Sequence, residues 1–163
     1  MRYYINIGTN LGDLAANVRS ALTMIGLRLG VNVRQSTPIC TDAWGYESEH
    51  RYMNVGASFD TAQRPEAVLR ELRGIEASMG SASHRNADGS YADRIVDIDV
   101  IAIDEMVIAT PELTVPHPRM EQRDFVLVPM AELAPEWRHP IVELTARELL
   151  ERLSRGQGAA DRP

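Results

Sequence analysis

The order of residue patterns along the chain constrains its fold more strongly than any single motif. Four stretches have the β-branched and aromatic composition, or the alternation of apolar and polar residues, that is typical of strands: Arg2 to Ile7, Val31 to Arg34, Tyr52 to Asp60 and Arg94 to Ile103. Apolar residues at helical spacing follow the first and the third of these stretches. The predicted order is therefore strand, helix, strand, strand, helix, strand.

Local signals mark the ends of the two helices. Asn10 and Asp13 have the character of N-cap and N3 residues for the first helix, and Gly30 ends it. Pro65 suits the first position of the second helix, and Gly80 suits its C-cap. This order predicts an α+β fold, a ferredoxin-like βαββαβ antiparallel sheet with the helices on one face.

The remaining chain extends this core. Met106 to Ala109 predicts a short extra strand, and Phe125 to Val128 with a last helix from Thr145 complete the domain as C-terminal strand and helix additions. A length of 163 residues suits one domain. We expect residues 1–155 to form that single domain and residues 156–163 to be a disordered tail.

The charged residues exclude several kinds of site. The 17 basic residues against 23 acidic ones give a net charge of −6, which argues against non-specific binding to nucleic acid or anionic membranes. All the basic residues are arginine, so a Walker-A or Schiff-base lysine is absent. Gly8 to Gly12 is therefore read as a strand-to-helix turn, and an anion must be bound by Arg, His or backbone N–H groups.

The single Cys40 indicates a reduced environment. It cannot form an internal disulfide, and we expect it to be a buried strand residue. The first residues lack the apolar core of a signal peptide, and every apolar stretch is too short for a membrane span. We expect a cytoplasmic protein.

Two acidic residues on the last predicted strand could hold a metal. Asp97 and Asp99 lie two apart, so both carboxylates point to the same face. Carboxylates held this close repel one another unless a cation lies between them, and Mg²⁺ with a substrate phosphate suits such a pair. The solvated face of a half-exposed strand explains the pair equally well.

Cationic side chains lie on both sides of this acidic pair in the sequence. Arg94, Arg119 and Arg123 could bind phosphate oxygens, and His117, between two prolines, could donate to one. Surface arginines and a turn histidine are the alternative. No two histidines have metal-ligand spacing, which argues against zinc.

An aromatic ring and an amide share one face of the third strand. Tyr52 and Asn54 could stack on a flat heterocycle and hydrogen-bond its edge, or they could make cross-strand contacts at a sheet edge. Phe125 and Trp44 could supply a second aromatic wall or belong to the core.

Four ordered blocks resemble one enzyme family over about residues 3 to 140. They are Ile7 to Asp13, Arg94 to Asp99, Leu113 to Arg119 and Arg123 to Pro129. Together they resemble the 6-hydroxymethyl-7,8-dihydropterin pyrophosphokinases of folate biosynthesis. The resemblance implies transfer of the diphosphate of ATP to the hydroxymethyl group of the pterin, with release of AMP.

The resemblance also implies roles for individual residues. Asp97 and Asp99 match residues that hold two Mg²⁺ ions, and Arg94 joins them as catalytic. The residues implied for ATP binding are Glu76, Arg85, Arg94, Thr114, His117 and Arg123. Those implied for pterin binding are Thr41, Asp42, Trp44, Tyr52, Asn54 and Phe125. Ser81 and Tyr91 depart from the family, whose members commonly carry arginine and tryptophan there.

Two other functions fit the same residues. The altered position at Ser81 suggests a non-catalytic pterin- or nucleotide-binding module, and the acidic pair suits another Mg²⁺-dependent nucleotidyl transferase. For the enzyme we expect ATP and the pterin as partners, without nucleic acid, membrane, an obligate protein partner or a fused second enzyme. The loops Thr41 to Arg51 and Ser81 to Asp93 are expected to close over both substrates.

Overall fold

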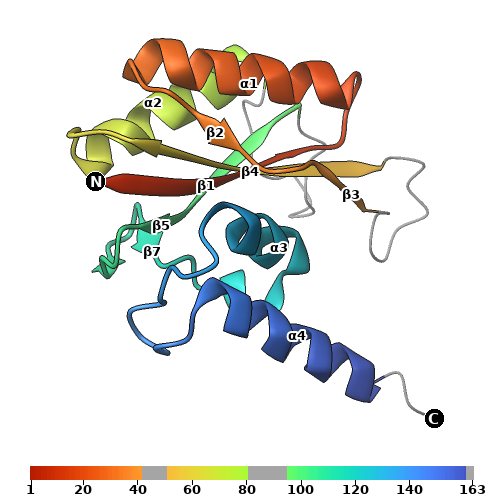
Figure 1. The fold of residues 1–163 in the computed structure, drawn as a ribbon. Helices are drawn as coiled ribbons and strands as arrows, with labels where there is room; N and C mark the ends of the chain where they lie inside the picture. Colours follow the sequence, from red (N-terminus) through yellow and green to blue (C-terminus); the bar gives the residue numbers. More distant parts are fainter. Residues whose placement is uncertain (42–50, 81–94, 161–163) are drawn as a thin grey trace.

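A computed structural model describes residues 1–41, 51–80 and 95–160 (Figure 1). Its main sheet has the order β2-β4-β1-β5, with β3 also pairing with β4, and every pair in it is antiparallel. The strands of this sheet are β1 (Arg2–Thr9), β2 (Arg34–Gln35), β3 (Ile39–Thr41), β4 (Tyr52–Asp60) and β5 (Asp97–Ile103).

The two helices that cross between these strands cover one face of the sheet. Helix α1 (Leu14–Leu29) links β1 to β2, and α2 (Pro65–Ser78) links β4 to β5, so each crossover passes over the strand that lies between its ends. This is the predicted ferredoxin-like arrangement, which is confirmed. Its core packs the inward residues of the sheet against both helices and includes Ile7, Val55, Ile98, Ile25 and Leu72.

A second helical layer covers the opposite face, so the prediction of helices on one face was incomplete (Figure 1). Helices α3 (Asp124–Leu133) and α4 (Ala146–Ala160) form it. Their core includes Tyr4, Leu127 and Trp137. Between β5 and α3 the chain forms the pair β6 (Ile108–Ala109) and β7 (Thr114–Val115) and the short helix η1 (Met120–Gln122). Among the described residues, no helix is both long and apolar enough to cross a bilayer.

Phe125 to Val128 belong to helix α3, which the sequence analysis did not predict. Pro129 lies inside this helix, where it has no N–H to donate, and for that reason the sequence does not read as helical. Its ring packs against the sheet at Gly56, where an added Cβ would lie 2.4 Å from the Cβ of Pro129. Helix α3 therefore approaches β4 closely because position 56 carries no side chain.

The first helix starts later than predicted. Asp13, and not Asn10, is its N-cap, and the Asp13 side chain accepts a hydrogen bond from the Ala16 N–H at 3.0 Å. Gly12 precedes it with φ +73°, a left-handed conformation that suits glycine. Gly8 to Gly12 is thus a strand-to-helix turn, as predicted.

Other local predictions need correction. Strand β2 begins at Arg34, where the predicted strand ended, and β5 begins at Asp97, three residues after the predicted start. Cys40 lies in β3 as predicted for a strand residue, but it is exposed rather than buried. Helix α4 extends to Ala160. The single domain over residues 1–155 and the tail from residue 156 stay predictions.

Candidate functional site

The register of three strands brings the two aspartates predicted to hold a metal and the asparagine predicted to bind the pterin onto one face of the sheet. Gly8 of β1 lies opposite both Asn54 of β4 and Asp97 of β5, and these three residues form one row. In the next row Asn6 lies between Gly56 and Asp99. Directly opposed residues share a face, and this one is opposite the face that α1 and α2 cover.

Gly8 keeps the middle of the first row open. A Cβ at position 8 would lie 3.2 Å from Asn54 Oδ1, so a side chain there would crowd the amide. The backbones of Asn54 and Asp97 are two strand spacings apart, roughly 10 Å. That separation leaves room for a small molecule that touches the amide at one end and the carboxylates at the other.

The start of helix α3 adds a cation and an aromatic ring to this face. Arg123, the N-cap residue, places its Nη1 3.9 Å from Asp99 Oδ2, and both side chains are partly exposed. Its guanidinium also lies 5.5 Å from the centre of the half-buried Phe125 ring. Arg123 and Phe125, predicted for the triphosphate and the pterin respectively, are thus neighbours beside the acidic pair.

Glu76 reaches the same pair from helix α2. Its side chain is buried, and Oε1 accepts a hydrogen bond from the Ile98 N–H at 2.7 Å. Among the described residues β5 is the outer strand of the sheet, so no described strand lies beside it to accept from this N–H. Burial raises the pKa of Glu76 to about 7; the Ile98 hydrogen bond opposes this rise, and Asp97 and Asp99 add to it.

The raised pKa of Glu76 predicts a loss of stability with rising pH. The folded protein binds this proton more tightly than the unfolded chain, whose carboxyl pKa is 4.5, so the contribution of Glu76 to stability is fully present below about pH 4.5 and is lost as the pH rises through about 7. In Glu76→Gln the amide oxygen still accepts from Ile98 but does not titrate. Between pH 5 and pH 8, we expect the free energy of unfolding of the variant to fall by about 1–2 kcal/mol less than that of the wild type. Urea unfolding without metal measures both.

Glu66→Gln is the control for this experiment, because Glu66 lies on the same helix and is exposed. Its pH profile should follow the wild type. Identical profiles for Glu76→Gln and the wild type would contradict the assignment of the pH effect to Glu76.

His117 is fixed next to β5 by backbone hydrogen bonds. Its N–H donates to the Ile101 carbonyl at 2.8 Å, and its Nδ1 accepts from the Arg119 N–H at 3.1 Å. Burial lowers the pKa of His117, and Arg123 and Arg119 lower it further. The imidazole is therefore neutral near pH 7, with its proton on Nε2, and can donate to an anionic oxygen.

The other predicted site residues fall into two groups. Thr41 pairs in register with Tyr52 at the β3–β4 edge, so both lie near Asn54, whereas Thr114 is exposed on β7 opposite Ala109. The second group lies outside the described residues, as do most of the two loops expected to close over the substrates. It consists of Asp42, Trp44, Arg85 and Arg94.

Asn6 is a residue of this face that the sequence analysis missed. It is buried at the centre of β1, and its Nδ2 donates to Asn54 Oδ1 at 3.0 Å. An amide between Ile5 and Ile7 in an otherwise apolar strand was the available signal. No motif included it, so it was not singled out.

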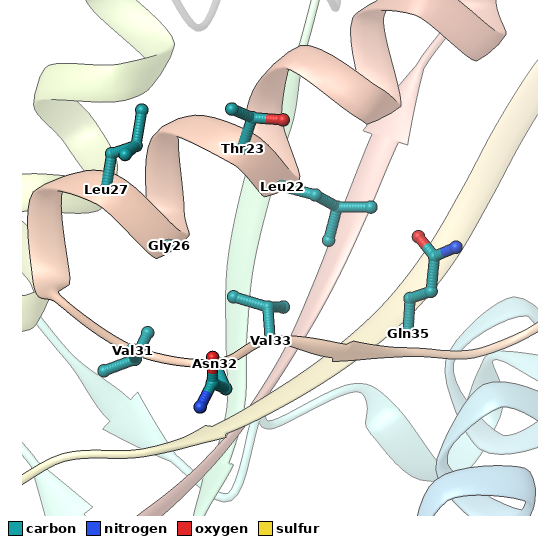
Figure 2. Close-up of a pocket in the computed structure, with 8 residues that line it drawn as sticks. All are labelled: Leu22, Thr23, Gly26, Leu27, Val31, Asn32, Val33 and Gln35. Atoms are coloured by element: carbon teal, nitrogen blue, oxygen red, sulfur yellow. The ribbon is translucent and has the colours of Figure 1, made fainter.

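A groove elsewhere in the molecule does not share this chemistry. It has a volume of about 450 Å³ and lies between α1 and the segment that leads into β2, where Leu22, Val31 and Val33 line it (Figure 2). None of its lining residues was predicted to bind a substrate. The polar face around Asn54 and Asp97 therefore remains the candidate site.

Comparisons with known proteins show which family the chain resembles. A family model described as 7,8-dihydro-6-hydroxymethylpterin-pyrophosphokinase (HPPK) matches residues 4–135. A Porphyromonas gingivalis protein named 2-amino-4-hydroxy-6-hydroxymethyldihydropteridine pyrophosphokinase is 36% identical over 138 residues, which cover 84% of this chain and 92% of the relative. A Methylorubrum extorquens protein of the same name is 33% identical over 153 residues, 93% of each chain.

Solved structures share the fold. The chain is similar to Plasmodium falciparum HPPK-DHPS with pteroate, with a TM-score of 0.75 and 14% sequence identity over 99% of this chain. It spans 44% of that longer chain.

Proposed function

The chain belongs to the 7,8-dihydro-6-hydroxymethylpterin-pyrophosphokinase family, and from this premise we propose how its residues carry out the transfer. It is an ATP-dependent pyrophosphokinase of folate biosynthesis. The hydroxymethyl oxygen of the pterin forms a bond to the β-phosphorus of ATP while the bond from that phosphorus to the α-phosphate oxygen breaks. AMP leaves, the hydroxyl loses its proton, and the product is the pterin diphosphate.

One observation of the structure supports this reaction for the present chain. The amide of Asn54 and the carboxylates of Asp97 and Asp99 lie on one face of the sheet, with Gly8 open between them. A heterocycle bound at the amide end would direct its hydroxymethyl group toward the carboxylate end. Such positioning is much of what phosphoryl transfer requires.

The pterin end is formed by β3, β4 and α3. Asn54 would hydrogen-bond the edge of the ring, and Tyr52 and Phe125 would contact its faces. Thr41, next to Tyr52 in register, would line the pocket. From the family resemblance we assign Asp42 and Trp44 to the same pocket.

The carboxylate end suits two Mg²⁺ ions. Asp97 and Asp99 offer hard oxygen donors on one face, and Mg²⁺ is commonly bound by one or two carboxylates together with substrate phosphates and water. When bound, the ions would neutralise charge on the diphosphate as it transfers. Arg123, near Asp99, would add a positive charge beside these phosphates.

The remaining ATP contacts come from residues around the outer strand. His117, neutral and protonated on Nε2, would donate to a phosphate oxygen, and Glu76 would support β5 from behind. Thr114, Arg85 and Arg94 are assigned to ATP from the resemblance, and Arg94 is also assigned a catalytic role from it. The cytoplasmic location predicted from the sequence stays a prediction.

The test is phosphorus NMR of the protein with Mg²⁺, ATP and 6-hydroxymethyl-7,8-dihydropterin. We expect AMP and a pterin diphosphate to appear in equal amounts. Release of inorganic diphosphate instead would point to a nucleotidyl transferase. Unchanged ATP from a folded sample that binds the pterin would point to a non-catalytic binding module.

A further inference from the structure

Asn6 lies on the candidate-site face of the sheet, between the strands that carry the residues assigned to the two substrates. It occupies the central strand β1, is 5% exposed, and lies opposite Asp99 on one side and Gly56 on the other. Its side chain contacts the amide of Asn54 in the neighbouring row, through the 3.0 Å hydrogen bond from Nδ2 to Oδ1. Asn6 therefore connects the metal end of the site with the pterin end.

The other half of the Asn6 amide is unsatisfied. Its Oδ1 is buried and has no hydrogen-bond partner within the part of the chain that the structure describes. A cavity of about 10 Å³ adjoins it, but the other side chains that line this cavity are mainly apolar, among them Ile101, Val126 and Met130. An unpaired buried acceptor lowers stability, and an apolar residue would avoid this loss. What the amide contributes is its donor to Asn54.

This donor determines which group Asn54 presents to a ligand. Because Asn54 Oδ1 accepts from Asn6, this bond fixes the direction of the amide and uses one lone pair of the oxygen, and the Asn54 Nδ2 is the donor that the amide has left for a ligand. If both amides rotated by half a turn, Asn54 would present its oxygen instead, and the NH₂ group of Asn6 would be buried without an acceptor. Buried N–H groups without partners are rarer than under-satisfied carbonyl oxygens, so the observed direction is favoured.

We propose that Asn6 is a positioning residue that holds the Asn54 amide with its N–H donor toward the heterocycle, and so selects a ring edge that carries an acceptor. The inference rests on the proposed function, in which that heterocycle is a pterin with a 4-oxo group. A ring with an amino group at the same position would place a donor against the Asn54 donor and would be disfavoured.

The experiment compares two pteridines on Asn6→Ala and the wild type. The probes are 6-hydroxymethylpterin and 2,4-diamino-6-hydroxymethylpteridine, and their Kd values are measured by fluorescence titration with no nucleotide present. We expect the preference of the wild type for the oxo compound to fall by about three- to tenfold in the variant. The free energy of unfolding should change little, because the variant removes the unpaired Asn6 oxygen but also leaves Asn54 Oδ1 without its donor.

Two further variants separate positioning from packing. Asn6→Leu restores the side-chain volume without a donor and should lose the preference as Asn6→Ala does. Ser58→Ala removes a buried hydroxyl from the same face of β4, one row beyond Gly56, and should keep the wild-type preference.

The outcomes are distinct. An unchanged preference in both Asn6 variants would overturn the inference while leaving the proposed function intact, and so would an equal loss of affinity for both compounds together with a loss of stability. A folded wild type that binds neither pteridine would overturn the proposed function, and the inference with it.

Discussion

Replacing Asp97 by alanine is expected to lower the rate of diphosphate transfer by about a thousandfold or more. Asp97 lies in the row of Gly8 and Asn54, and in the proposed function it is one of the two carboxylates that would hold the metal beside the transferred group. Without this carboxylate the proposed Mg²⁺ site would lose a ligand, and the positive charge that would neutralise the diphosphate would be lost with it. Formation of AMP, followed by phosphorus NMR or a coupled assay, measures the loss.

Pterin affinity without nucleotide should change little in Asp97→Ala, because Asn54 lies two strands away on β4. Asp60→Ala is the matched control. Asp60 is an exposed carboxylate at the far end of β4, paired with Arg2, and its loss should leave transfer unaffected. Wild-type turnover in Asp97→Ala would show that the metal assignment is wrong, whereas loss of pterin binding in a folded variant would show that the two ends of the site are not separate.

Gly56→Ala is expected to destabilise the protein by about 2–3 kcal/mol, although alanine is ordinarily the better residue within a strand. The new Cβ would lie 2.4 Å from the Cβ of Pro129, a distance that forces helix α3 away from the sheet. Arg123 and Phe125 lie at the start of that helix and would move with it. Pterin affinity should therefore fall together with the free energy of unfolding.

Urea unfolding and pterin titration on the same samples check this prediction. Gly156→Ala is the control, because an added Cβ there meets nothing within 4 Å and should stabilise helix α4 by about 0.5–1 kcal/mol. If Gly56→Ala proved as stable as the wild type, α3 would be free to shift, and the close contact with β4 would not be what fixes the site.

The periodic parts of the fold were predictable from the sequence. Tyr52–Asp60 forms a strand with the predicted bounds, because its alternation matches a strand with one face in the core. The same period of two correctly placed Asp97 and Asp99 on one face. Helix α3 was not predicted, since the contact between Pro129 and Gly56 that places it joins residues far apart in the sequence.

The site was predictable only where single residues carry the chemistry. Glu76 entered through the family resemblance, but its hydrogen bond to Ile98 depends on β5 being the outer strand, which is a property of the topology. The role of Asn6 depends on strand register, because its amide reaches Asn54 only when β1 pairs with β4 in the observed register. Local patterns contain neither fact.

The bond between Glu76 and Ile98 also bears on self-association. The N–H groups of an outer strand are where a strand of another molecule can add, and β5 is an outer strand of the sheet among the described residues. Glu76 occupies one of these groups midway between Asp97 and Asp99. At the opposite edge β2 has only two residues, too few to template a long pairing. The helix that covers the core thereby also occupies an N–H that a strand added at this edge would need for pairing.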